Sequence, residues 1–532
     1  METISTEVVV VGAGPSGAAA AWRLAQAGLK VVSIERGDWF AYDEVRRDQP
    51  DYELRRAGPL HANPNIRRGR DDAPVDDVDS PIKPMIGNAV GGGSIYWSAH
   101  VPRFRPEDFR IATLDGIGSD WPISYDDLAP YYEENEKRLG TAFVPGDPSA
   151  PPRGEHGLTL PTIGAHGRRF GKAFDRLGWH WWPVDLVVGR EADDPATVHC
   201  THAGPCDLGC PSRIRSGADQ AYMHDAIANG VRLLTRTRVM RLEHDADGRV
   251  TAALCMTDEG PLRVEGRIFV LAANGMGTPH LLLLSRSERF PDGLGNDSGL
   301  VGRNLMLHPY ARVDGLFPEA MGAWAAGEKA GIVSFEFYAT RPERDFVRGL
   351  KLQLTGGPAP VALACGAGAG SMLPWGEAHH AAFEERFDRI CGLTVCAEDL
   401  AEDRNRITLS ETLVDRDGTP APKMIYTLSD NSRRILDFGM DRAEEVLREA
   451  GATAIDRTPL RAEAGFHLMG TARMGQDPAR SVVDPFGRCH GVPNLYITDA
   501  SVFVTSAAIN PTATAQALAL RTADSIAATF LQ

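Results

Sequence analysis

A run of four valines near the start of the chain opens its most regular hydrophobic pattern. Residues Val8–Val11 are apolar without interruption, which is typical of a strand buried on both faces of a parallel sheet. An alanine-rich stretch over residues 18–27 predicts a helix that ends at Gly28. Residues 29–34 predict a second strand, which closes at Glu35. Strand, helix and strand in this order predict a βαβ unit, and hence an α/β fold.

Further apolar patterns extend this prediction along the chain. Residues 268–272 predict another buried strand, and residues 312–465 show a weaker alternation of apolar and polar positions. Apolar residues at helical spacing predict helices over residues 125–138, 222–229, 377–389, 432–450 and 511–531.

A glycine-rich turn joins the first strand to the first helix. Gly12, Gly14 and Gly17 have the spacing G-x-G-x-x-G of dinucleotide-binding sites. There the first glycine permits the turn, the second lets a pyrophosphate approach the backbone, and the third lets helix and strand pack closely. The helix start offers unbonded N–H groups to phosphate. Glu35 can accept hydrogen bonds from ribose hydroxyls, so we predict a dinucleotide site, although this fingerprint does not distinguish FAD from NAD.

The stretches with such patterns lie at both ends of the chain and in its middle. We therefore expect a discontinuous Rossmann-like cofactor domain with an α+β substrate-binding domain inserted into it. The predicted limits are 1–110, 196–311 and 466–532 for the cofactor domain, 111–195 for a connecting insert on the substrate side, and 312–465 for the substrate-binding domain.

Composition and charge narrow the classes of function. The 532 residues are 43% hydrophobic and 24% charged, which is ordinary for globular proteins and enough for two packed domains. The net charge of −15 argues against nucleic acid or an anionic membrane as partner. No apolar run reaches about 18 residues, so we expect no membrane span. The acidic N-terminus lacks a secretory pattern and the 8 cysteines form no disulfide framework, so we expect a cytoplasmic protein unless a partner subunit exports it.

Five ordered motifs, spread over nearly the whole chain, are similar to those of the glucose–methanol–choline (GMC) flavoprotein oxidoreductases. They occupy residues 12–35, 90–97, 302–309, 467–475 and 494–512. Within this family the chain resembles the catalytic subunits of bacterial sugar dehydrogenases and the pyranose oxidases. The resemblance implies FAD rather than NAD as cofactor. It also implies that the reaction oxidises the CH–OH group of a sugar, polyol or bulky aryl alcohol to a carbonyl.

The resemblance also assigns cofactor contacts beyond the glycine turn. They are Gly91, Gly92, Gly93 and Ser94 beside the flavin, Asp499 and Ala500 near the ribityl chain, Val239 near the adenine, and Thr512 and Ala513 at the start of the last helix. In some relatives a histidine near residues 90–97 carries the flavin covalently. Here Tyr96 stands at the corresponding position, so we expect FAD to be bound noncovalently.

His467 and Asn510 are the predicted catalytic pair. Oxidation of an alcohol removes a proton from oxygen and a hydride from carbon, and a flavin accepts the hydride. A histidine, with an ordinary pKa near ~6.5, is suited to take the proton at neutral pH. Asn510 can hold the substrate oxygen, and we expect it to be the N-cap of the last helix, with Pro511 as first helical residue. We expect His308, beside Pro309, to have a structural role.

Three cysteines with the spacing C-x5-C-x3-C-P form a second candidate centre. Thiolates of Cys200, Cys206 and Cys210 could converge on an iron–sulfur cluster, and three ligands suit a 3Fe-4S cluster. Zinc would need a fourth ligand, such as His199 or His202. The spacing is similar to that of glucose dehydrogenase subunits whose cluster passes electrons to a cytochrome. A cluster-free packing loop, or one disulfide and a free thiol, is the alternative.

The five remaining cysteines show no ligand pattern, and we expect them to be packing residues. Three other functions stay open beside the dehydrogenase. The chain could be an oxidase that uses oxygen, or a non-redox lyase that keeps FAD as a structural group. A non-catalytic flavin-binding subunit is disfavoured by the intact pair of His467 and Asn510. A cluster at the three cysteines would favour the dehydrogenase, with a cytochrome or quinone as electron acceptor.

Overall fold

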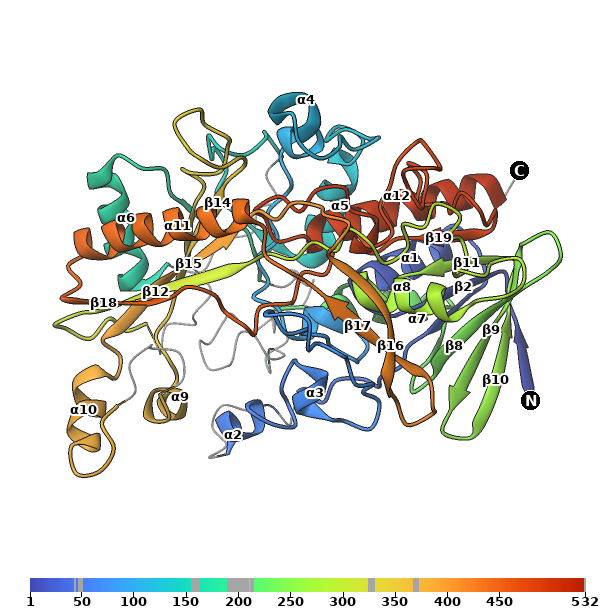
Figure 1. The fold of residues 1–532 in the computed structure, drawn as a ribbon, viewed down its shortest axis with the longest axis horizontal. Coiled ribbons are helices and arrows are strands. Elements are labelled where there is room, and N and C mark those ends of the chain that lie inside the picture. The colour runs from blue at the N-terminus through green and yellow to red at the C-terminus, as the bar shows by residue number, and fades with distance from the viewer. Residues whose placement is uncertain are drawn as a thin grey trace.

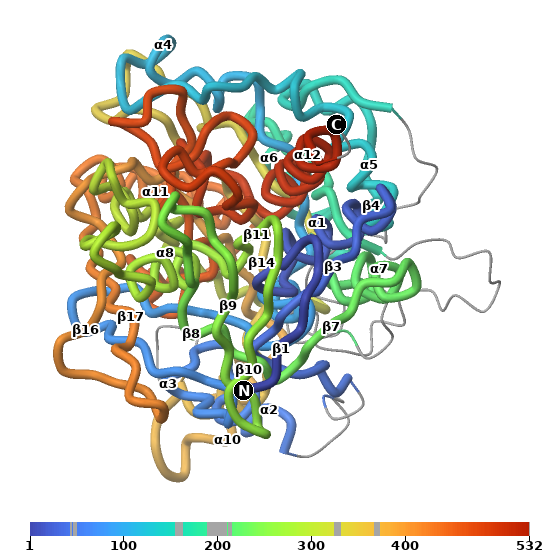
Figure 2. The backbone as a smooth tube through the Cα atoms, turned by 90° about the vertical axis from the view of Figure 1, so that its right-hand side faces the viewer, coloured from blue at the N-terminus to red at the C-terminus, as the bar shows by residue number. Residues whose placement is uncertain are grey.

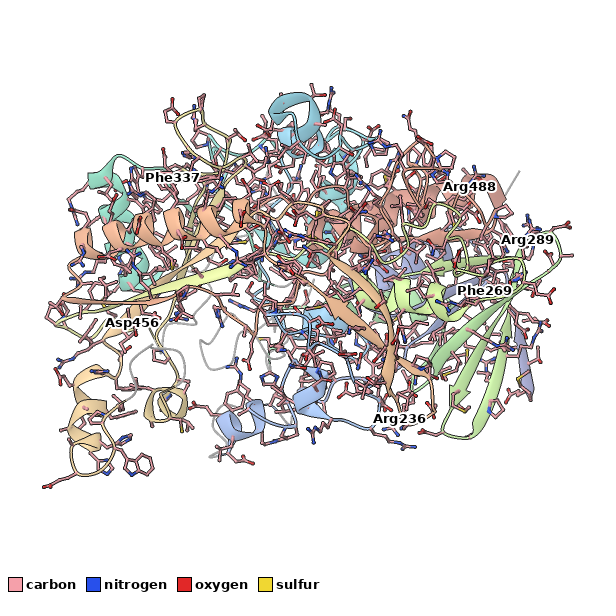
Figure 3. The ribbon with its side chains drawn as sticks, in the orientation of Figure 1. Arg236, Phe269, Arg289, Phe337, Asp456 and Arg488 are labelled. Carbon is pink, nitrogen blue, oxygen red and sulfur yellow. The ribbon has the colours of Figure 1, made fainter. Side chains whose placement is uncertain are left out.

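The computed structural model describes residues 1–42, 45, 51–154, 163–188, 210, 215–323, 331–366 and 373–530. Two halves lie side by side along the long axis, one built on a parallel sheet and the other on a largely antiparallel sheet (Figure 1). Figure 3 labels one buried aromatic residue in each half, Phe269 in the first and Phe337 in the second. The chain passes between the halves more than once, so neither half is continuous in sequence.

The parallel sheet has five strands. Its order is β19 (Leu495–Ile497), β11 (Ile268–Leu271), β2 (Val8–Val11), β3 (Val31–Ile34) and β7 (Arg232–Leu234), and all neighbours pair in parallel. All four valines of β2 are buried, as the apolar run predicts for a strand covered on both faces. The strands come from three separate stretches of chain, so this half is the discontinuous Rossmann-like unit expected from the sequence.

Helices α1 (Pro15–Gln26) and α12 (Thr512–Phe530) pack against each other beside this sheet, and α5 (Ala129–Leu139) packs on α12 (Figure 2). The hydroxyl groups of Tyr132 on α5 and Thr514 on α12 are hydrogen-bonded at 2.7 Å. Helices from the beginning and from the end of the sequence therefore pack together, and the first of them follows the glycine turn.

Other elements complete this half. A second sheet has the order β1 (Glu2–Ser5), β10 (Gly260–Glu265), β9 (Val250–Thr257) and β8 (Arg238–His244). A π-helical turn over Asp219–Met223 continues into α7 (His224–Ala228), and α8 (Asn274–Leu284) follows β11.

The second half is built on a six-stranded sheet. Its order is β18 (Ala454–Thr458), β12 (Tyr310–Leu316), β15 (Ile390–Ala397), β14 (Leu350–Thr355), β13 (Ile332–Ser334) and β5 (Trp182–Pro183). The amphipathic helix α11 (Asp430–Glu449) packs on β12 and β15, and α6 (Gly164–Leu177) packs on α11. The side chain of Ser429 accepts a hydrogen bond from the backbone N–H of Ser432 and so caps α11.

The remaining elements are short. They are α2 (Tyr52–Arg56), α3 (Pro64–Arg67), α4 (Ile111–Asp115), α9 (Pro360–Ala364), α10 (His379–Arg386), β4 (Thr141–Ala142), β6 (Leu186–Val187), β16 (Arg406–Val414), β17 (Pro420–Ile425), and the 3-10 helices Gly92–Ile95, Pro106–Phe109 and Ala500–Val502. Among the helices that can be described, none is both long and apolar enough to cross a membrane.

The predicted domain limits stay predictions, but the structure refines the picture near two of them. Strand β12 starts at Tyr310, before the expected limit at residue 312. The stretch 111–195 contributes to both halves, since α5 packs on α12 whereas β5 joins the six-stranded sheet. Apolar spacing alone could not reveal this, because it does not state which neighbour an amphipathic element packs against.

Candidate active site

A cavity of about 950 Å³ is lined by residues of both halves. Gly12 and Glu35 of the parallel-sheet half line it, and so do Tyr310, His467 and Asn510. The glycine turn and the predicted catalytic pair, which lie far apart in the sequence, therefore line the same cavity.

The glycine turn is built as the motif predicts. Gly12 has φ of +100°, and a Cβ atom at Gly17 would lie 1.9 Å from the carbonyl oxygen of Gly12, so no side chain fits there. Gly14 is the N-cap residue of α1 and offers no side chain to the first turn of that helix. The N–H groups at the start of α1 are therefore left for a ligand, and Gly14 and Ser16 line the cavity.

Glu35 is buried beside this turn. One carboxylate oxygen accepts a hydrogen bond from the N–H of Ala13 at 2.8 Å, and the other accepts one from the N–H of Gly37 at 3.0 Å. Burial raises the pKa of Glu35, and these backbone bonds oppose that rise. The carboxylate is thus held in place, and each oxygen keeps a lone pair for a ribose hydroxyl.

The predicted cofactor contacts divide into two groups. Ten line the cavity: Gly12, Gly14, Glu35, Gly92, Gly93, Ser94, Val239, Asp499, Ala500 and Thr512. Three lie outside the lining: Gly17, Gly91 and Ala513. Asp499 accepts hydrogen bonds from the N–H groups of Asn274 and Ser501 and from the hydroxyl of Thr278, so it also organises the loops around it.

Asn510 does not have the capping role that the sequence predicts. Helix α12 begins at Thr512, and the N–H of Ala515 bonds to the carbonyl of Pro511, so Pro511 occupies the N-cap position. The side-chain oxygen of Asn510 instead accepts a hydrogen bond of 2.5 Å from the ammonium group of Lys351. The oxygen of Asn510 is therefore bonded to the buried ammonium group of Lys351 rather than to the backbone N–H groups at the start of α12.

Lys351 also settles how the Asn510 amide is oriented. An ammonium group can only donate, so the atom it contacts must be the amide oxygen. The NH₂ group of Asn510 is therefore not engaged by Lys351, and Asn510 lines the cavity. Lys351 is fully buried, and burial lowers its pKa.

His467 is hydrogen-bonded to a second histidine behind it. The Nδ1 atoms of His467 and His308 lie 2.7 Å apart, and Nε2 of His308 lies 2.5 Å from the carbonyl oxygen of Ala507. A carbonyl only accepts, so Nε2 of His308 carries a proton. In the neutral pair, Nδ1 of His308 then accepts from Nδ1–H of His467, and Nε2 of His467 is left with a lone pair.

The surroundings shift the pKa values of the two histidines in opposite directions. Burial, together with the positive charges of His308 and Lys351, lowers the pKa of His467 well below its ordinary value. Burial also disfavours charge on His308, but the negative charge of the Cys396 thiolate and the carbonyl of Ala507 outweigh burial and raise the pKa of His308. An additional proton on the pair is therefore held better by His308.

The six-stranded sheet presents two rows of polar side chains to this region. Residues opposite one another on neighbouring strands share a face of the sheet, as do residues two positions apart on one strand. The rows are Tyr310, Cys396 and Lys351, followed by Arg312, Thr394 and Gln353. All of these except Cys396 and Lys351 line the cavity.

Cys396 is more than the packing residue expected from the sequence. Burial alone would raise the pKa of its thiol, but His308 and Lys351 outweigh burial and lower that pKa to about 7. Its neighbour Tyr310 has its pKa raised well above the ordinary value, chiefly by burial.

Sequence reasoning missed Lys351 and underrated His308. The signal that the sequence offers for Lys351 is a lysine between two leucines in an alternating stretch that forms β14. His308 stands next to Pro309, which by itself suggests a structural role. The structure shows that its side chain is fully buried and hydrogen-bonded to His467.

Only part of the three-cysteine segment can be described. Cys200 and Cys206 lie outside the described residues, and Cys210 is a half-buried free thiol. The six cysteines that the structure describes are all free.

A glycine turn with a ribose-type carboxylate, facing the same cavity as a histidine held by a second histidine, defines a dinucleotide-dependent oxidoreductase. The chain belongs to the GMC oxidoreductase family. The N-terminal GMC oxidoreductase model matches residues 8–310, and the C-terminal model matches residues 401–519.

Three named relatives match the chain over nearly its full length. The 2-methyl-1,2-propanediol dehydrogenase of Mycolicibacterium austroafricanum is 36% identical, over 99% of this chain and 96% of the relative. The fructose dehydrogenase large subunit of Gluconobacter japonicus is 30% identical, over 99% and 98%. The paromamine 6'-oxidase of Streptomyces fradiae is 31% identical, over 98% and 91%.

A solved structure shares the fold. Pyridoxine 4-oxidase from Mesorbium loti superposes with a TM-score of 0.66 at 18% sequence identity, over 98% of this chain and 99% of that chain.

FAD, the cofactor expected from the motifs, fits the residues that are present. The free N–H groups of α1 suit a pyrophosphate, and the carboxylate of Glu35 suits a ribose. The cavity continues past these groups to the start of α12 and to His467. The expected flavoprotein class and the GMC family are confirmed by the family models.

Proposed function

We propose that this chain is an FAD-dependent dehydrogenase that oxidises the CH–OH group of a polar alcohol to a carbonyl. One observation carries the proposal. His467 and Asn510 line the same cavity as the glycine turn, and each has a buried partner that determines which of its atoms is left for a substrate.

The cofactor would be held by the glycine turn, Glu35, Val239 and the loop over residues 92–94, with Asp499 supporting the neighbouring loops. When bound, FAD supplies the acceptor for the hydride that leaves the alcohol carbon. In this chain Tyr96 supports noncovalent binding, since no histidine stands at that position.

His467 is proposed to take the hydroxyl proton. Because the carbonyl of Ala507 holds a proton on Nε2 of His308, the Nδ1 atom of His308 accepts from His467. Nε2 of His467 then has the lone pair that general-base catalysis requires. Without His308, either tautomer of His467 would be populated and only a fraction of molecules would present the base.

His308 is also proposed to share the proton once it has been taken. As Nε2 of His467 accepts the substrate proton, its Nδ1 proton can move along the 2.7 Å hydrogen bond to Nδ1 of His308. The raised pKa of His308 and the lowered pKa of His467 both favour this transfer. The base is thereby returned to its neutral form.

Asn510 is proposed to hold the substrate oxygen as a hydrogen-bond donor. Lys351 occupies the amide oxygen, so the NH₂ group is left to donate to the alkoxide as the proton leaves. The positive charge of Lys351 also polarises the amide and strengthens its N–H donors.

The side chains along the cavity support a polar substrate. Tyr310, Arg312, Gln353 and Thr394 all offer hydrogen-bonding groups from one face of the six-stranded sheet. Sugars and polyols would use such groups better than long aliphatic alcohols would, because each buried polar group needs a partner. The names of the diol and fructose dehydrogenases among the relatives support the same choice.

The electron acceptor is proposed to be a partner protein or a quinone. The cysteine spacing over residues 200–210 supports a 3Fe-4S cluster as the exit route, and this rests on the sequence alone. The name of the fructose dehydrogenase large subunit supports assembly with other subunits. A cytoplasmic location is part of the proposal, and the free thiols of the described cysteines support a reducing compartment.

The test is an anaerobic visible spectrum of the purified holoenzyme before and after addition of each of several alcohols. The panel contains 2-methyl-1,2-propanediol, fructose and benzyl alcohol. Bleaching of the flavin peaks by one compound, followed by slow recovery in air and fast recovery with a quinone, supports the dehydrogenase. Fast recovery in air would instead establish an oxidase, and cleavage of a substrate without bleaching would establish a lyase.

Iron analysis of the same anaerobic preparation tests the cluster. About three irons per chain in the wild type would support the cluster, provided that the Cys206→Ser variant, prepared in parallel, contains fewer. An iron-free protein whose dye-linked activity is unaffected by Cys206→Ser would overturn it.

A further inference from the structure

Arg461 is a cation on the wall of the cavity that has no partner among the described residues. It follows β18 by three residues, and its N–H donates to the carbonyl of Tyr310 at 2.8 Å. The ring of Tyr310 in turn lies 6.2 Å from that of His467, measured between centroids. Arg461, Tyr310 and the proposed base His467 all line the same cavity.

No described residue forms an ion pair or a hydrogen bond with the guanidinium group of Arg461. The two nearby carboxylates are engaged elsewhere, Asp314 by Arg312 at 2.7 Å and Glu463 by His61 at 3.6 Å. Arg461 is exposed, and it lines the cavity. The protein packed around its side chain still lowers the pKa of the guanidinium group. Arg312 adds to that lowering, because it is a second positive charge nearby.

A guanidinium group on the wall of a cavity, without a counter-ion among the described residues, is available to an anionic ligand. A ligand that brings a negative charge would form two parallel charge-assisted hydrogen bonds with it. The face beside it adds neutral donors from Gln353 and Thr394. A single unpaired arginine near Glu463 suits a monoanion better than a phosphate dianion.

We propose that Arg461 binds the carboxylate of the substrate, so that the physiological substrate is a hydroxy acid or a sugar acid. This rests on the proposed function, with His467 and Asn510 acting on the hydroxyl at the other end of the same molecule. Tyr310 is a neighbour of both Arg461 and His467, since its ring lies 6.2 Å from that of His467 and its side chain acts electrostatically on Arg461. We therefore expect a short carbon chain or ring between the carboxylate and the reacting hydroxyl.

The experiment compares matched pairs of substrates. Glycolate, γ-hydroxybutyrate and para-(hydroxymethyl)benzoate are each compared with their own primary amide, which keeps the size and removes the charge. The quantity measured is the ratio of kcat/KM for acid over amide. We expect the ratio to exceed one for at least one pair in the wild type, and to fall about 10- to 100-fold in Arg461→Gln, as loss of a charge-assisted bond predicts. Arg461→Lys should retain part of the preference, since a point charge remains.

Arg457→Gln is the matched control. Arg457 lies on β18, four residues before Arg461, but pairs with Asp441 and Glu444 on the outer surface. Its removal changes the net charge equally, so an unchanged ratio in this variant excludes a general electrostatic effect.

A binding measurement keeps the test independent of turnover. Para-toluate has the carboxylate but no hydroxyl, and its Kd is measured by its perturbation of the flavin spectrum in each holoenzyme. We expect Arg461→Gln to weaken binding at least about 10-fold at unchanged FAD content. The proposal would be overturned if both proteins bound para-toluate equally, or if the wild type preferred the amide in every pair. It would also be overturned if Arg461→Gln lost its FAD. If para-toluate binds through Arg461 but no alcohol reduces the flavin, the anion site stands and the proposed oxidation fails.

Discussion

Replacement of Lys351 by methionine should separate catalysis from stability. Lys351 is fully buried and contacts the side-chain oxygen of Asn510 at 2.5 Å, and burial lowers its pKa. Methionine has a similar length and flexibility but no charge, so it fills the same space. Replacement of a buried charge by a hydrophobic residue of similar volume is often neutral or stabilising by about 1–4 kcal/mol. We therefore expect the unfolding free energy of Lys351→Met to be equal to or above that of the wild type.

The catalytic effect should have the opposite sign. Without Lys351 the Asn510 amide is free to rotate, and its N–H donors are no longer polarised. A hydrogen bond to a charged group contributes about 1.5–3 kcal/mol, so loss of this orientation should lower the rate of flavin reduction about 10- to 100-fold.

The assay is anaerobic stopped-flow reduction of the holoenzyme, combined with urea unfolding of the same preparation. Lys137→Met is the control, because Lys137 lies on the exposed surface of α5 and forms an exposed ion pair with Glu133. This variant should change neither quantity much. A wild-type reduction rate in Lys351→Met would refute the orienting role. An unfolded or strongly destabilised variant would show that Lys351 is structural.

Two further predictions concern the same network. His308→Gln should move the acid limb of the kcat/KM profile to lower pH. Activity is present above the pKa of the histidine pair and lost as pH falls through it, and the variant keeps only His467, whose pKa burial lowers. A pH profile over several alcohol concentrations measures this, and an unmoved or raised acid limb would argue against proton sharing. Asn510→Asp should keep the fold, because a carboxylate pairs with Lys351, but should reduce flavin about 10- to 100-fold more slowly, because it has no N–H donor. Wild-type reduction by Asn510→Asp would show that the substrate oxygen needs no donor there.

The parts of the fold that sequence predicts well are those that local pattern determines. The continuous apolar run Val8–Val11 predicts a strand that is buried on both faces, and the strand is buried in this way. The glycine turn after it was also predictable, because a side chain at Gly12 or Gly17 would collide with neighbouring backbone atoms. Both features depend on residues that are close together in the chain. The same holds for the amphipathic helix α11, which lies within two residues of the predicted limits.

The parts of the site that sequence did not predict depend on distant residues. His308 and His467 are 159 positions apart, and so are Lys351 and Asn510. No local rule could indicate that an ammonium group would take the Asn510 oxygen from the start of α12. Likewise, Cys396 stands beside His308 and Tyr310 only because β12 and β15 pair in one register.

The most direct test of the account is the rate of flavin reduction by an alcohol in His467→Ala holoenzyme, measured anaerobically against the wild type. General-base catalysis contributes about 10²–10⁴-fold, so the account predicts a loss of this size with FAD still bound. The loss should be smaller at high pH, where the alcohol itself ionises more readily. A variant that keeps FAD and reduces it at a rate close to wild type would contradict the assignment of His467 as the proton acceptor.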